Sequence, residues 1–250
     1  MSRTLLRNLL ILCCLAGSPV ALADYTILTT AMPPYVNEDG KSGIALDITT
    51  EMFRRANIKF DLKVVPLARA LKQAEKKEQT CVVPLQRSQE RETLYKWISP
   101  VLVTQSALFS PPDAKFDLAV LADARPYKIG VYRGSALEEY LQGAGFDFDV
   151  QAANSEEKNA KKLNSGRVDI WAADAVAGPY YAKKANVRLK QQIIFSSTLR
   201  AIACHIDTPD SEVERLTDVL KGMYGDGTVK RIFTTYTKDL DVGDLGQFLN

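Results

Sequence analysis

The residues best suited to chemistry in this sequence lie between Pro84 and Pro100, PLQRSQERETLYKWISP. The apolar run 81–85 predicts a strand that ends at Pro84 or lies at a sheet edge there, because proline donates no ladder hydrogen bond. Ser88, followed by an acidic turn, predicts the start of a helix. Such a helix start leaves unpaired backbone N–H groups, and Arg91 adds a fork of donors suited to a carboxylate. The segment therefore predicts an anion site, with a solvated surface arginine as the alternative.

Residues 1–23 have the pattern of a secretory leader. Arg3 and Arg7 provide the basic start, residues 9–16 a short apolar core, and the small residues before Ala23 a cleavage pattern. The apolar core is too short to span a bilayer. We expect export to the periplasm with cleavage after Ala23.

The charge balance argues against polyanionic partners. Without its leader the chain loses two of its 32 Lys and Arg residues, and those that remain match its 30 Asp and Glu residues. No basic run exceeds three residues, so we expect no nucleic-acid partner and no anionic membrane surface. No later segment is apolar enough to insert into a membrane.

Chemistry that depends on histidine or on a metal is not expected. The chain has one histidine, His205, and the two cysteines beyond the leader are Cys81 and Cys204. These residues cannot make the usual His/Cys metal cluster or an ordinary catalytic triad. We therefore expect no metal and no other cofactor.

The elements that must position the site alternate between strand and helix. The periodicity of the apolar residues predicts two β-α-β-α-β halves on either side of Pro111 and Pro112. The expected strands cover 25–31, 60–64, 81–85, 127–131, 148–152 and 168–173, followed by a strand at 199–206. The expected helices cover 44–56, 67–74, 135–142, 155–163 and 175–184, followed by helices from 213 to 223 and from 228 to 236. The pattern indicates two α/β lobes with a ligand cleft beyond the carboxyl ends of their strands.

Several segments resemble the extracellular solute-binding proteins of family 3, the periplasmic receptors of polar amino-acid importers. Ser88, Arg91, Trp97, Ser99 and Pro100 are similar to that family's arginine-bearing segment. Four further segments resemble family motifs in the same order: Pro34-Tyr35 with Asp39-Gly40 and Asp47, Gly130-Val131 with Gly134-Ser135, Gly166-Arg167-Val168-Asp169 with Asp174, and Asp226-Gly227-Thr228.

The resemblance implies an α/β, two-lobe periplasmic binding protein fold of type II. Each lobe would be a mainly parallel sheet flanked by helices, with the ligand cleft between the lobes. The chain would cross between lobes twice, at 104–110 and 195–201. Lobe one would comprise 24–109 plus 199–250, and lobe two 110–198. Such a hinge suits closure around a ligand.

The same resemblance suggests roles for individual residues. Arg91 would bind the α-carboxylate of the ligand, and Asp174 would bind its α-ammonium from the other lobe. A helix cap is the structural alternative for Asp174. The other expected contacts are Ser135 beside the ligand carboxylate, Tyr35 on the cleft wall and Leu85 at the end of its strand. Arg69 is a further candidate, which a second acidic group on the ligand would explain, with a solvated surface residue as the alternative.

The two cysteines lie in strands expected in lobe one. Because two free thiols are unusual in an oxidising compartment, we hypothesise a Cys81–Cys204 disulfide. Two small buried thiols are the alternative.

The resulting hypothesis is a binding protein without catalytic activity. We expect a monomer that captures an amino acid or a close relative and delivers it to the membrane permease of an ABC importer. The alternatives are a ligand-sensing partner of a membrane receptor and an enzyme on the same scaffold, because cyclohexadienyl dehydratases also resemble this family. An enzyme would need an acid placed to protonate a leaving hydroxyl, and Asp174 and Glu90 are the candidates.

Overall fold

The computed structural model describes residues 25–143, 145 and 148–242. The expected leader, with its cleavage site after Ala23, and residues 243–250 lie outside the described residues. The strands of the described part form one sheet in the order β2-β1-β3-β8-β4-β7-β5-β6. They are β1 (Tyr25–Thr29), β2 (Phe60–Val64), β3 (Thr80–Gln86), β4 (Lys96–Ser110), β5 (Lys128–Tyr132), β6 (Asp149–Ala153), β7 (Ile170–Asp174) and β8 (Lys190–Cys204).

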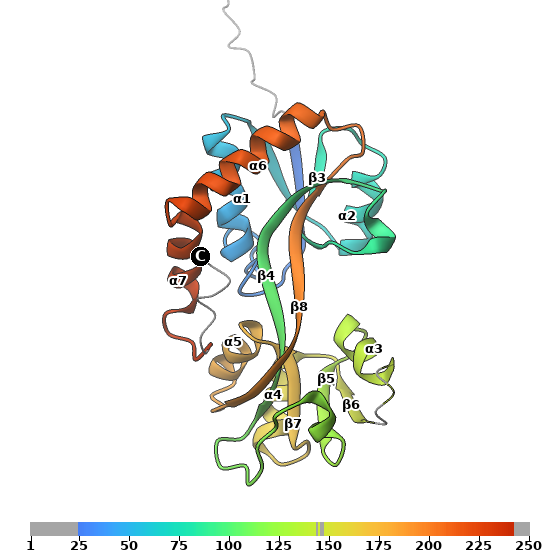
Figure 1. Cartoon of the computed structure of the whole chain (residues 1–250), viewed down its shortest axis with the longest axis vertical. Helices are drawn as coiled ribbons and strands as arrows, with labels where there is room; N and C mark the ends of the chain where they lie inside the picture. The colour runs from blue at the N-terminus through green and yellow to red at the C-terminus, as the bar shows by residue number, and fades with distance from the viewer. Residues whose placement is uncertain (1–24, 144, 146–147, 243–250) are drawn as a thin grey trace, which may run out of the picture.

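Helices cover this sheet in two groups, one at each end of the molecule (Figure 1). The first lobe contains β1–β3 with α1 (Ile44–Arg55), α2 (Leu67–Ala74), α6 (Asp210–Gly225) and α7 (Thr228–Thr237). The second lobe contains β5–β7 with α3 (Ala136–Gly143), α4 (Glu156–Asn164) and α5 (Ala177–Lys184). Strand β1 pairs in parallel with β2 and β3, and β5 pairs in parallel with β6 and β7. The predicted α/β class, with a mainly parallel sheet in each lobe, is confirmed.

Two long antiparallel strands connect the lobes. Strands β4 and β8 each have 15 residues, pair with each other, and run from one lobe into the other (Figure 1). The predicted crossings at 104–110 and 195–201 lie inside them. Because both strands continue through the crossing, the division of the chain at 109/110 and 198/199 stays a prediction.

Helix α1 shows how the sequence pattern builds the core. Ile44, Ile48 and Met52 recur every four residues and are fully buried. They share a core with Ile27 of β1 and Cys81 of β3. Because a helix has 3.6 residues per turn, side chains four residues apart lie on one face. This apolar face packs against the sheet.

The region around Pro84 differs from the sequence prediction. Strand β3 does not end at Pro84 but continues to Gln86, between β1 and β8. The register with β8 shifts between Val82 and Leu85, and such an irregularity accommodates a residue that donates no hydrogen bond. The expected helix after Ser88 is a single 3₁₀ turn, Gln89–Arg91, and is therefore too short to supply an anion site.

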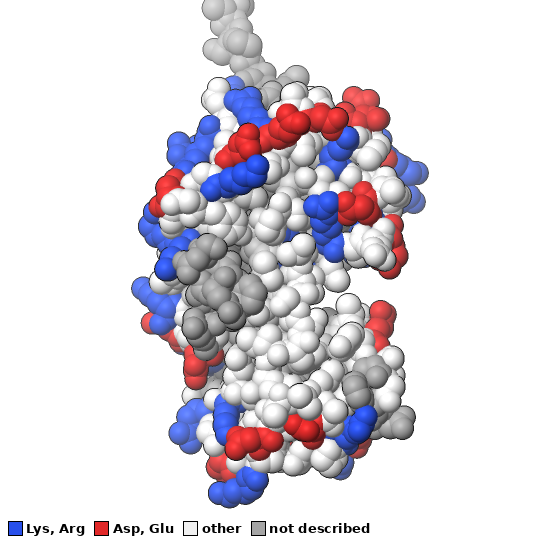
Figure 2. Space-filling view, in the orientation of Figure 1, with Lys and Arg blue, Asp and Glu red and all other residues white. Residues whose placement is uncertain are grey.

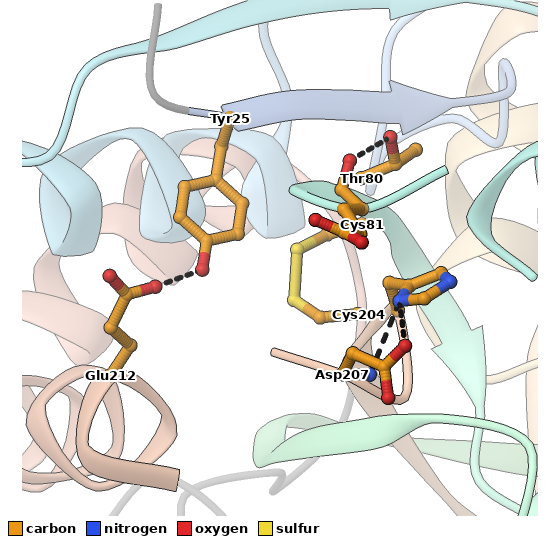
Figure 3. The surroundings of a disulfide bond; sticks show 8 residues. Tyr25, Thr80, Cys81, Cys204, Asp207 and Glu212 are labelled. Atoms are coloured by element: carbon orange, nitrogen blue, oxygen red, sulfur yellow. Dashed lines mark hydrogen bonds and ion pairs between the residues drawn. A yellow bond between two sulfur atoms is a disulfide. The ribbon is translucent and has the colours of Figure 1, made fainter. Parts of the chain in front are cut away.

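The predicted disulfide between Cys81 and Cys204 is confirmed. The two residues face each other in the β3–β8 register and are bonded to each other in the core of the first lobe. Figure 3 shows the bond beside Tyr25, which donates its hydroxyl to Glu212 of α6. The disulfide therefore joins the third strand of the first lobe to the end of β8, where the chain returns to that lobe.

Residues 238–242, which follow α7, contact both lobes: Lys183 of α5 in the second lobe donates to the carbonyl of Asp239, and the main core spans the two lobes. Thr237 is buried, and Leu240 and Val242 lie against the main core. Among the described helices, none combines the length and apolar character that crossing a membrane requires.

Candidate functional site

A cleft of about 800 Å³ lies between the lobes, at the notch visible in Figure 2. Both lobes and both connecting strands contribute to its lining. The polar and aromatic side chains of the lining include Tyr35, Glu38, Thr104, Ser106, Tyr132, Ser135, Tyr140, Glu156, Asp174, Tyr181, Lys184, Ser196, Thr198 and Arg200.

Asp174 ends β7 and caps α5 at the same time. Its Oδ1 atom accepts hydrogen bonds from the backbone N–H groups of Val176 and Ala177, each at 2.9 Å. The same oxygen accepts the hydroxyl of Tyr35 at 2.7 Å. Its Oδ2 atom has no hydrogen-bond partner among the described residues, which leaves it available to a ligand. Burial raises the pKa of this carboxyl, while the charge of Arg200 opposes that rise.

Tyr35 reaches Asp174 from the opposite lobe. It lies in the loop between β1 and α1 and is buried. Burial, together with the neighbouring Asp174 carboxylate, raises the pKa of its phenol well above the usual value. The hydroxyl therefore stays protonated and acts as a donor at any physiological pH.

Arg200 provides a cation in the lining of the cleft. It lies on β8, is half-buried, and donates from Nε to Thr104 Oγ1 at 3.3 Å. No carboxylate of the described residues forms an ion pair with its guanidinium. Burial lowers the pKa of Arg200, although the negative charge of Asp174 acts the other way. A desolvated guanidinium with free N–H groups favours binding of an anion.

Hydroxyl groups surround Arg200 on the cleft floor. Thr104 faces Thr198, and Ser106 faces Ser196, in the β4–β8 register. All four line the cleft. Because side chains alternate along a strand, residues 196, 198 and 200 lie on one face of β8. This face offers a polar surface of uncharged hydrogen-bonding groups around one cation.

Glu156 is a second acidic group of the cleft, on the second lobe. It is the first residue of α4, after the Ser155 cap. Trp171 Nε1 donates to its Oε2 atom at 3.1 Å, and Asn159 Nδ2 donates to the same atom at 3.4 Å. Burial raises the pKa of Glu156 to about 7, and the negative charge of Asp174 adds to the rise.

The remaining wall is aromatic, with one ion pair between the lobes. Tyr132, Tyr140 and Tyr181 all come from the second lobe. Lys184 of α5 contacts Glu38 of the first lobe at 2.7 Å. This pair satisfies the charge of the lysine without help from a ligand.

The structure brings three of the six predicted ligand contacts to the cleft: Tyr35, Asp174 and Ser135. Ser135 also caps α3, because its Oγ accepts the N–H of Glu138 at 3.1 Å. Both roles foreseen for Asp174 are compatible, since its cap uses Oδ1 alone.

The other three predicted residues lie outside the cleft lining. Arg91 is half-buried and donates to the carbonyl of Gln86, a residue of the cleft lining, at 3.4 Å. Its positive charge still affects the cleft, because repulsion between the two guanidinium groups contributes to lowering the pKa of Arg200. Arg69 is exposed on α2, and Leu85 is buried in a small core beside that helix. Their roles in ligand binding stay predictions.

Sequence reasoning missed Arg200 and Glu156. A signal for Arg200 was present, since Ser196, Thr198 and Arg200 alternate with other residues in an expected crossing strand. Glu156 resembles any acidic residue in the first turn of a helix, so no local pattern indicates its burial. No group of three or more metal-ligating side chains occurs within the described ranges.

Comparisons with known proteins identify the fold. No protein-family model and no curated protein sequence matches this chain. Many solved structures have similar folds, and three of them illustrate the likeness. A histidine kinase sensor domain with similarity to periplasmic binding proteins has a TM-score of 0.69 at 16% identity, over 86% of this chain and 96% of its own.

The second is the second substrate-binding domain of a putative amino acid ABC transporter from Streptococcus pneumoniae, with a TM-score of 0.70 at 14% identity, over 85% of this chain and 99% of its own. The third is an ancestral arginine-binding protein bound to arginine, with a TM-score of 0.66 at 22% identity, over 85% of this chain and 97% of its own. The chain therefore has the two-lobe α/β fold of periplasmic binding proteins.

Proposed function

We propose that this chain is a periplasmic solute-binding protein of the family 3 type. It captures an amino acid or a close relative in the cleft between its lobes and delivers it to the permease of an ABC importer. The observation that carries the proposal is the pair of opposite charges in the cleft: the unpaired guanidinium of Arg200 and the free Oδ2 atom of Asp174. The two groups are close enough for the charge of each to shift the pKa of the other.

A zwitterion suits this arrangement. Its carboxylate would accept hydrogen bonds from Arg200 and from the surrounding hydroxyl groups, and its ammonium would donate to Asp174. Both protein charges are partly removed from water, so that each gains more from an opposite charge than it would on the surface. As the family resemblance implies, Arg91 would reach the carboxylate if the lobes close further.

The fold supports more than one downstream partner. A transporter domain and a kinase sensor domain share it with this chain. Delivery to an importer is our proposal because the motif segments resemble the importer receptors. A membrane-bound sensor would use the same cleft and the same ligand chemistry.

A thermal-shift screen of amino acids tests the binding claim. A ligand at about 100 times its Kd stabilises the folded state by about 2.7 kcal/mol, which for a chain of this size raises Tm by roughly 5–10 °C. We expect at least one amino acid to give such a shift. Removing one partner of a desolvated charge pair weakens binding by about 2–5 kcal/mol, so Arg200→Ala and Asp174→Ala should each abolish the shift.

Arg188→Ala is the matched control, because Arg188 does not line the cleft. If no amino acid shifts Tm while prephenate or arogenate is turned over, the enzyme alternative replaces the proposal. If a ligand binds equally well to both cleft variants, the assignment of these two residues is wrong.

A further inference from the structure

The acidic side of the cleft has more negative charge than one ammonium group requires. Glu156 and Asp174 line the same cleft, and the charge of Asp174 contributes to the raised pKa of Glu156. Within the described ranges, no Lys or Arg nitrogen lies within 4.0 Å of the Glu156 oxygens. Lys184, the lysine of the cleft lining, contacts Glu38 instead.

The Glu156 carboxyl is held in place for a contact. Trp171, which is fully buried, and Asn159 both donate to Oε2. The Oε1 atom has no hydrogen-bond partner among the described residues. The Glu156 carboxyl group is thus fixed by two donors, has a second carboxylate nearby and has no cation of its own. A cationic ligand would stabilise its ionised form.

We infer that Glu156 binds a second cationic group of the ligand, so that the preferred ligands are basic amino acids. This inference rests on the proposed function and adds the ligand class to it. The carboxylate of the ligand lies at Arg200, its α-ammonium at Asp174, and its side-chain cation at Glu156. Tyr181 lines the same cleft, burial and the charge of Glu156 contribute to its raised pKa, and an aromatic ring near a bound cation favours it further.

Binding of such a ligand couples to pH. The titratable and charged groups around Glu156 are Asp174 from the end of β7, Tyr181 and Lys184 from α5, Glu157 from its own helix, and Glu38 from the opposite lobe. Glu157 has a cation of its own, Lys161, at 2.6 Å. A cation at Glu156 favours the ionised carboxylate, so that binding near pH 7 releases a proton from it.

The test compares L-arginine with L-citrulline, which has a similar shape but a neutral side chain, by titration calorimetry. We expect the wild-type protein to prefer arginine about tenfold or more at pH 8, the ratio that one charge-assisted hydrogen bond provides. The preference should shrink at pH 6, where Glu156 is protonated. Glu156→Gln should bind both ligands with similar affinity at either pH. Glu139→Gln, an equal charge change at an exposed residue of α3, should retain the wild-type preference.

A second measurement needs no variant. Titrations of arginine into the wild-type protein at pH 7, in two buffers with different ionisation enthalpies, should report proton release, and titrations of citrulline should report none. If citrulline or L-glutamate binds as tightly as arginine, or if Glu156→Gln keeps the preference, the inference is wrong and the proposed function stands. If no amino acid in the panel binds, both are wrong.

Discussion

Tyr35 of the first lobe donates its hydroxyl to Asp174 of the second lobe at 2.7 Å, across 139 residues of sequence. The hydrogen bond connects the loop before α1 to the start of α5, inside the cleft. In this conformation it satisfies one lone pair of a carboxylate that burial makes costly to ionise. Two residues that the sequence predicts to bind a ligand thus also link the two lobes to each other.

Removing this hydroxyl should destabilise the protein. Tyr35→Phe leaves the buried Asp174 oxygen with only its two backbone donors. A lost hydrogen bond to a buried charged group costs about 1.5–3 kcal/mol, so we expect Tm to fall by roughly 3–12 °C. Scanning calorimetry of the ligand-free protein measures this. An unchanged Tm would show that the link between the lobes contributes nothing to stability.

The loop that carries Tyr35 should tolerate no side chain at Gly43. This glycine has φ 133°, and a Cβ atom would lie 2.5 Å from the carbonyl oxygen of Tyr35. Gly43→Ala must therefore displace the loop or strain the backbone. Such strain typically costs about 1–3 kcal/mol. Gly222→Ala is the matched control, because a Cβ at that helical position meets no atom within 4 Å. Equal denaturant midpoints for the two variants would contradict the prediction.

The sequence predicts the elements that local periodicity defines better than those that depend on contacts with distant strands. Helix α1 was predictable, since Ile44, Ile48 and Met52 repeat with the helical period and all face the core. The β3–β8 disulfide followed from the compartment and the cysteine count. Pro84 was misjudged because a register shift, which depends on the partner strand, accommodates it inside the sheet.

The site was predictable only where a local motif marks it. Asp174 and Tyr35 lie in segments with family-like neighbours, so they were found. Glu156 becomes unusual only through tertiary contacts, namely burial, Trp171 and the distant Asp174. The presence of Arg200 in the cleft depends on which face of β8 is turned toward it. The twist of β4 and β8 determines that orientation, and no local sequence pattern reveals it.

The stability of the ligand-free protein should fall as pH rises from about 4.5 to about 7. The pKa of Glu156 is about 7 in the folded state, against 4.5 for the free side chain, so between these values the folded state binds more protons than the unfolded state. The effect is present in full below pH 4.5 and is lost by about pH 7. At about 1.4 kcal/mol per pKa unit, this contribution amounts to at most roughly 3.5 kcal/mol.

Glu156→Gln should remove this slope, because glutamine cannot ionise but keeps acceptor capacity for Trp171. Urea unfolding at pH 5 and at pH 8 measures the difference. The variant should gain stability over the wild-type protein at pH 8 but not at pH 5. A wild-type free energy of unfolding that rises between these two values would contradict the assignment.

The disulfide should contribute strongly to the stability of the first lobe. Cys81 and Cys204 are 123 residues apart, and the chain-entropy model assigns about 5 kcal/mol to closing so long a loop. We expect Cys81→Ala/Cys204→Ala to lower the denaturant midpoint markedly. Alkylation of the denatured, unreduced wild-type protein provides the chemical check, since two labelled thiols would refute the bond.

The central claim is that the cleft binds a small zwitterion between Arg200 and Asp174. Mass spectrometry of the protein, purified without denaturation and released from its ligand by acid, tests it most directly. The account predicts one equivalent of a compound with a carboxylate and an amine, retained by Arg188→Ala but lost from Arg200→Ala and Asp174→Ala. A bound sugar or an amine-free dicarboxylate, or equal retention by all three variants, would contradict it.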